Sequence, residues 1–149
     1  MIDKEISSEQ AISKTIHIKA TTSKVWIVLT NPEFMKQWMS DYELNIRSEW
    51  KVGSQIQITG HLHGIPFENK GVILQLDPEK TFEYTFWTTL SEQADKPENY
   101  SYIKFILLAD QTNTTLILNQ SNFKTETVFK HWEFYWNATL EIIKQLSEK

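Results

Sequence analysis

The chain has 149 residues, of which 40% are hydrophobic and 23% charged, as is usual for one globular domain. A net charge of −4, with Arg47 as the only arginine, argues against a nucleic-acid-binding surface, because such surfaces concentrate positive charge. Cysteine is absent, which excludes disulfides, thiol nucleophiles and thiolate metal sites.

The N-terminal stretch MIDKEISSEQ has no apolar core and no basic leader, so we expect no signal peptide. Apolar runs such as FILLA are far shorter than a membrane span. We therefore expect a cytoplasmic protein without membrane insertion. Residues 1–12 are polar and patternless and are interpreted as a tail, followed by a single domain over residues 13–149.

A strand is predicted first, because Ile16 and Ile18 alternate with polar residues in SKTIHIKA. The following segment, TTSKVWIVLTNPEFMKQWM, predicts two short helices. One of the polar residues 21–23 is expected to cap the first helix. Asn31 and Pro32 have the form of a second N-cap with proline at the first helical position.

Between residues 42 and 121 the apolar period changes to two, and turn residues recur at fairly regular intervals. This pattern predicts six strands, near residues 42–49, 54–62, 66–76, 80–88, 100–109 and 114–121. The short connections favour antiparallel pairing of consecutive strands. The longest loop is the acidic segment LSEQADKPEN.

Residues 126–148 have a strong helical period. A helix of about 23 residues is about 34 Å long, enough to cross a small sheet. Phe134 falls among the polar residues on its outer side. The core-facing side is predicted to carry Val128, Phe129, Trp132, Tyr135, Trp136, Thr139, Leu140, Ile143 and Leu146.

These elements together predict an α+β fold with a curved, seven-stranded antiparallel sheet. Two short helices follow the first strand, and the long C-terminal helix covers one face of the sheet. A strongly twisted sheet wrapped around one helix cannot close at both ends. We therefore expect space to remain between the sheet and the helices, and we expect function there.

Five motifs over residues 13–148 carry a family resemblance: Ala20…Val25-Trp26…Leu29-Thr30-Asn31-Pro32-Glu33…Trp38-Met39, VGSQIQI, FENKGVILQLDPEKTFEYTFW, TTLILNQSNF and Trp136-x3-Leu140-x2-Ile143-x2-Leu146. In this order they resemble the activator-of-heat-shock-protein-90-ATPase-like family, within the START, polyketide-cyclase and birch-pollen-allergen-like superfamily. The resemblance implies the helix-grip fold. It also implies a cavity that holds lipids, sterols, polyketides or other apolar molecules, without fixing the ligand.

The candidate ligand-binding residues are Trp38, Met39, Ile58, Phe67, Tyr84, Phe86, Tyr102, Phe105, Trp132 and Trp136. Trp132 lies nearer the open end and is expected to line the pocket, whereas Trp136 is expected to pack in the core. Trp38 and Met39 are interpreted either as an adaptable gate or as residues that only fix the second short helix to the sheet.

The strand over residues 80–88 has two possible phases. In the first, Phe82, Tyr84 and Phe86 face the cavity, together with Ile56, Ile58, Ile103, Phe105, Leu107, Leu116 and Leu118 from neighbouring strands. In the second, Trp87 faces inward.

His61 and His63 share one face of a strand, and Glu68 follows on the next. Without a cysteine or a defined third ligand, the histidines are interpreted as solvent-exposed strand-end residues, and no metal or cofactor is expected. His17 and His131 lie in polar surroundings and receive no role. The sequence contains no nucleophile elbow, P-loop or dinucleotide fingerprint, so no catalytic residue is assigned.

The function expected from these patterns is the binding of a small apolar or amphipathic molecule. One alternative is an enzyme of the cyclase, aromatase or hydrolase kind, which requires two polar groups converging in the cavity. The other is a chaperone-accessory module that uses an outer face including Phe134. The eukaryotic co-chaperone for which the family is named has an additional N-terminal domain, which this chain is too short to contain.

Overall fold

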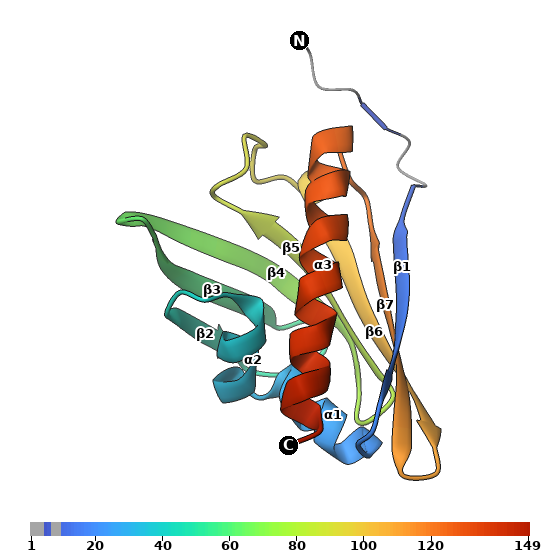
Figure 1. The fold of residues 1–149 in the computed structure, drawn as a ribbon. Helices are drawn as coiled ribbons and strands as arrows, with labels where there is room; N and C mark the ends of the chain where they lie inside the picture. Colours follow the sequence, from blue (N-terminus) through green and yellow to red (C-terminus); the bar gives the residue numbers. More distant parts are fainter. Residues whose placement is uncertain (1–4, 7–9) are drawn as a thin grey trace.

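The computed structural model describes residues 5–6 and 10–149. Its elements follow the predicted order, as Figure 1 shows. They are β1 (Ile12–Ile18), α1 (Thr22–Thr30), α2 (Pro32–Met39), β2 (Leu44–Ser48), β3 (Gln55–Leu62), β4 (Ile65–Asp77), β5 (Thr81–Thr88), β6 (Ser101–Asp110), β7 (Asn113–Ser121) and α3 (Glu126–Ser147). The sequence did not predict the 3₁₀ turn η1 (Pro97–Asn99), which lies in the longest loop.

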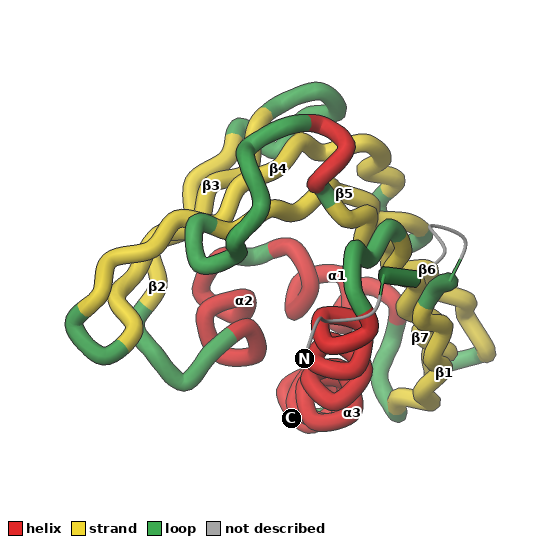
Figure 2. Tube along the Cα trace, turned by 90° about the horizontal axis from the view of Figure 1, so that it is seen from above, coloured by secondary structure: helices red, strands yellow, loops and turns green. Residues whose placement is uncertain are grey.

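All seven strands form one antiparallel sheet in the order β1-β7-β6-β5-β4-β3-β2. Strands β2 to β7 pair consecutively, as their short connections predicted. The first strand adds beside the last, with Ile16 opposite Leu116. Viewed from above in Figure 2, the sheet arches over α1, α2 and α3, which lie inside its curve.

The pairing of β4 with β5 is irregular, because the register shifts between Ile73 and Gln75. Gly71 lies just before this irregularity. A Cβ atom at Gly71 would stand 1.7 Å from the Thr85 carbonyl oxygen, so only glycine fits this crossing. The Val72 amide donates instead to the Thr85 hydroxyl at 2.8 Å, which closes the gap in the ladder.

The two short helices begin at the predicted caps. Thr21, the N-cap of α1, accepts a hydrogen bond from the Lys24 amide. Asn31, which directly precedes Pro32, is the N-cap of α2 and accepts one from the Glu33 amide. The Trp38 indole of α2 donates to the Val28 carbonyl of α1 at 2.8 Å. This bond fixes the helices to each other, which holds α2 beside the concave face of the sheet.

The buried residues of α3 all lie between Trp136 and Ser147, and the helix packs on α1, α2 and β1. Trp136, Leu140 and Ile143 are almost fully buried, whereas Val128 is 42% exposed. The predicted apolar side of α3 is therefore core over its second half. Over its first half it faces a hollow.

The predicted tail falls partly outside the described residues. Within the described part, Glu5 forms a β-bridge with Thr125, Ile6 packs against the core, and Ile12 opens β1 with 3% exposure. No helix in the described part of the chain is long and apolar enough to cross a membrane.

Candidate functional site

A cavity of about 770 Å³ lies between the concave face of the sheet, the end of α2 and the first half of α3. Its inner wall consists of buried side chains, among them Ile58, Tyr84 and Ile103. Its rim includes exposed residues of the loop after β5 and of α3, such as Glu92 and His131. The space that the fold leaves inside the sheet is thus open on one side.

Aromatic rings line the α3 side of the cavity. Trp132 meets Phe86 edge-on at 5.2 Å between ring centroids and stacks on Trp136 at 6.0 Å. Tyr135 meets Trp136 edge-on at 5.1 Å, and Trp38 closes the inner end at 6.5 Å from Trp136. Rings packed in this way form a rigid apolar wall with little conformational entropy to lose on binding.

A buried polar chain fixes the Trp136 ring. Its indole nitrogen donates to Gln120 Oε1 at 2.6 Å, and Gln120 Nε2 donates to the Ser101 hydroxyl at 3.1 Å. Gln120 is fully buried, and Ser101 borders the cavity. Because a buried amide is costly unless both of its ends are paired, these bonds hold Trp136 in one orientation.

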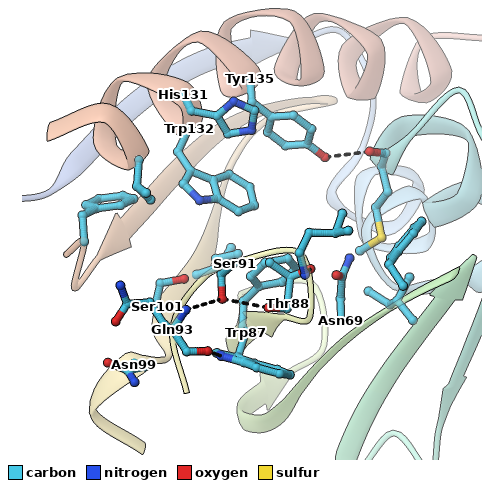
Figure 3. Close-up of a pocket in the computed structure, with 18 of the residues that line it drawn as sticks. Asn69, Trp87, Thr88, Ser91, Gln93, Asn99, Ser101, His131, Trp132 and Tyr135 are labelled. Atoms are coloured by element: carbon cyan, nitrogen blue, oxygen red, sulfur yellow. Dashed lines mark hydrogen bonds between the residues drawn. The ribbon is translucent and has the colours of Figure 1, made fainter. Parts of the chain in front are cut away.

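Two tyrosines give the inner cavity neutral hydroxyl groups. The Tyr135 hydroxyl donates to the Met39 carbonyl at 3.0 Å and ties α3 to the end of α2, as Figure 3 shows. Burial raises the pKa of Tyr135 to about 12. Burial also raises the pKa of Tyr84, with the nearby Tyr135 adding to the shift. Both phenols therefore keep their protons at neutral pH.

The loop over residues 89–99 covers the rim and is held from its outer side. Asp95 accepts from the Tyr100 hydroxyl and from Lys70, both at 2.5 Å. The Lys70 ammonium also lies over the Trp87 ring, whose indole donates to the Gln93 carbonyl at 3.2 Å (Figure 3). The hydrogen bond from Lys70 holds the pKa of Asp95 below its usual value.

We expect Asp95→Ala to speed hydrogen exchange of the loop amides about two- to fivefold, the size typical of a solvent-exposed ion pair. The folded-state pKa of Asp95 is lowered, so ionised Asp95 stabilises the loop fully above the unfolded carboxyl pKa of about 3.9. This stabilisation is lost as the pH falls through the lower folded-state pKa. Wild type and variant should therefore converge in strong acid. Glu98→Ala, in the same loop, is the control. Equal exchange rates in Asp95→Ala and Glu98→Ala at neutral pH would show that Asp95 does not hold the loop.

Most of the predicted ligand-binding residues border the cavity, namely Trp38, Met39, Ile58, Phe67, Tyr84, Phe86, Trp132 and Trp136. Two predicted residues do not. Phe105 is fully buried beneath Trp38 and Trp136, where it belongs to the solid core. Tyr102 alternates with the buried Ser101 and Ile103, which places it, 41% exposed, on the outer face of the sheet.

Burial distinguishes the two phases of β5 and the two tryptophans of α3. In β5 the inward phase carries Phe82, Tyr84 and Phe86, of which the first two are almost fully buried. Trp87 stacks on Tyr100 beside the rim loop and borders the cavity there. Trp136 is core and cavity wall at once, and Trp132 is only half-buried.

Several lining residues were missed by sequence reasoning. Asn69, Ser101 and Thr88 are polar residues in the inward phase of their strands, a signal that sequence reasoning overlooked. His131, for which no role was expected, lines the rim (Figure 3). His63 lies in the β3–β4 turn and hydrogen-bonds the Tyr42 hydroxyl at 3.3 Å. Within the described residues no three His, Asp or Glu side chains are grouped as metal ligands.

Comparison with known proteins identifies a matching family and solved structures with the same architecture. Residues 19–148 match the family model for Activator of Hsp90 ATPase homolog 1-like protein. The chain is 34% identical to the solution structure of ChR145 from Cytophaga hutchinsonii, with a TM-score of 0.80 and 94% of each chain covered. No protein with a curated description matches.

Two further solved structures show the same fold. The Aha1 dimer from Colwellia psychrerythraea is 24% identical, with a TM-score of 0.73 and 93% of this chain and 96% of that one covered. MLL2253 from Mesorhizobium loti is 22% identical, with a TM-score of 0.72 and coverage of 92% and 96%.

Proposed function

The chain belongs to the Activator of Hsp90 ATPase homolog 1-like family, and from this premise we propose that it binds a small apolar or amphipathic molecule in the cavity between the sheet, α2 and α3. One observation carries the proposal: an open hollow of about 770 Å³ beside a core of almost fully buried side chains. Protein interiors are normally packed as densely as organic crystals, and ligand sites typically occupy about 300–1,000 Å³.

The lining supports an apolar ligand with a polar end. The inner wall is made of rings and aliphatic side chains and includes Trp38, Ile58 and Trp136. The charged side chains Glu92 and Lys124 and the imidazole of His131 come from the rim loop, the β7–α3 connection and the first half of α3. An amphipathic molecule would therefore place its apolar part inside and its polar end at the rim.

Binding is the activity that this site supports better than catalysis. An acid–base mechanism near neutral pH needs a group whose pKa lies close to neutrality. The inner hydroxyls of Tyr84 and Tyr135 have pKa values raised well above neutrality by burial, so they serve as hydrogen-bonding groups.

The partner-binding alternative draws on Phe134, which is 78% exposed on the outer side of α3. Lys130 and Asn137, about one turn away on either side, are polar and exposed. A single exposed ring is common on protein surfaces, so Phe134 alone supports no partner.

Titration of intrinsic tryptophan fluorescence with fatty acids, sterols, flavonoids and polyketides tests the proposal. We expect at least one class to give a saturable change, because Trp132 lies against the cavity. Trp132→Phe should remove most of that change. Trp50→Phe, a half-buried tryptophan that packs on Phe82, should leave it intact. A change that depends on Trp50 instead, or no saturable change in any class, would contradict binding in this cavity.

A further inference from the structure

Asn69 is a polar residue in the middle of the apolar sheet face. It lies on β4 opposite Ile58 of β3 and Thr88 of β5, in the inward phase with Phe67. Figure 3 shows the Asn69 side chain pointing into the space between the sheet and α3, and cavity-lining residues of α3 such as Tyr135 lie across that space. A molecule bound in the cavity would therefore contact Asn69.

The carbonyl oxygen of the Asn69 amide, Oδ1, lacks a hydrogen-bond partner. It is the one buried side-chain nitrogen or oxygen without a partner among the described residues. An acceptor left unpaired in this way has lost its water without compensation, so it lowers the stability of the empty protein. Such a group in a folded protein calls for an explanation, and an unfilled site provides one.

The groups around Asn69 define what it can bind. Tyr84, on the neighbouring strand, remains a neutral phenol, and no described residue hydrogen-bonds its hydroxyl. The basic lining residues belong to other elements: Lys124 to the β7–α3 connection and the exposed His131 to α3. An anion placed beside Asn69 would therefore lose its hydration without gaining a cation.

We propose that the ligand carries an uncharged hydroxyl group on its buried, apolar part and that this hydroxyl hydrogen-bonds the Asn69 amide. The inference rests on the proposed function and adds which chemical group of the ligand the cavity recognises. A half-turn of the amide exchanges Oδ1 and Nδ2, and a hydroxyl both donates and accepts, so it pairs with either atom. A methyl ether only accepts, and it leaves Oδ1 unpaired.

Isothermal titration calorimetry with three matched probes tests this: 4-hydroxybiphenyl, 4-methoxybiphenyl and biphenyl-4-carboxylate. Wild type should bind the hydroxyl compound about tenfold more tightly than the methyl ether, the effect of one hydrogen bond, and should bind the carboxylate most weakly. Asn69→Leu should bind the hydroxyl compound and the ether equally. Asn119→Leu is the matched control and should keep the preference, because Asn119 lies in the outward phase of β7 and does not border the cavity.

Thermal unfolding of the empty proteins supplies the second readout. Asn69→Leu should melt about 2–4 °C higher than wild type, since it removes an unpaired polar group and adds apolar surface. A residue with a structural role would give the opposite sign.

The outcomes separate the inference from the proposed function. Equal binding of the hydroxyl and ether probes by wild type, a preference that survives Asn69→Leu, or a lower melting temperature for Asn69→Leu would overturn the inference while leaving cavity binding intact. Binding of none of the probes by wild type would overturn both.

Discussion

Gly71→Ala is expected to lower the free energy of unfolding by at least about 3 kcal/mol. The added Cβ would stand 1.7 Å from the Thr85 carbonyl oxygen and 2.5 Å from its carbon, and these are backbone atoms that cannot rotate away. Strands β4 and β5 must therefore separate, which disturbs the crossing that shapes the concave face. Urea denaturation followed by tryptophan fluorescence measures the loss.

Gly53→Ala is the matched control. Gly53 has a φ of +89°, and a Cβ atom added there would meet nothing within 4 Å, so this substitution tests backbone strain without a clash. It should cost about 1–2 kcal/mol. A Gly71→Ala protein no less stable than Gly53→Ala would show that β4 and β5 are not held this closely.

Trp136→Phe is expected to cost about 2–4 kcal/mol of stability. The ring is 1% exposed, and its indole nitrogen is the hydrogen-bond donor to Gln120 Oε1. Phenylalanine leaves that oxygen buried and unpaired and also leaves a small void between Trp38 and Phe105. Chemical denaturation gives the size of the effect.

Trp132→Phe, one turn earlier on α3, is the control for loss of an indole. Trp132 is half-buried, and no described residue accepts a hydrogen bond from its ring nitrogen. It should cost about 1 kcal/mol or less. Equal losses at the two positions would mean that the bond to Gln120 adds nothing to stability.

The fold could be predicted from the sequence because its signals are local. The period of two over residues 42–121 specified six strands, and Asn31 with Pro32 marked the boundary between the two short helices. Short connections left few pairings for those strands. The place of β1 beside β7 was not predicted, because no local pattern fixes it.

The site was less predictable because periodicity reports which face is buried and not what covers it. Phe105 and Ile58 have the same inward phase, yet Phe105 lies under Trp38 and Trp136 while Ile58 borders the hollow. The difference arises because the buried part of α3 begins at Trp136, whereas side chains of its first half border the hollow. For Tyr102 the period of two indicates the outer face, because its neighbours Ser101 and Ile103 point inward.

The rim loop and the Asn69 amide depend on contacts between distant segments. Asp95 meets Lys70 across 25 positions of sequence, and a single sequence carries no signal for such a pair. Asn69 was detectable in principle, as a polar residue in the inward phase of β4. Its lack of a partner is a property of the folded structure alone.

Native mass spectrometry of the purified protein, incubated with a small-molecule and lipid extract, tests most directly whether the cavity holds a ligand. We predict one bound molecule per chain. We also expect Thr88→Trp, which places a ring inside the cavity, to weaken that binding about tenfold or more, the effect typical of overpacking. A protein that retains no molecule, or retains the same one equally well in Thr88→Trp, would contradict binding in the cavity.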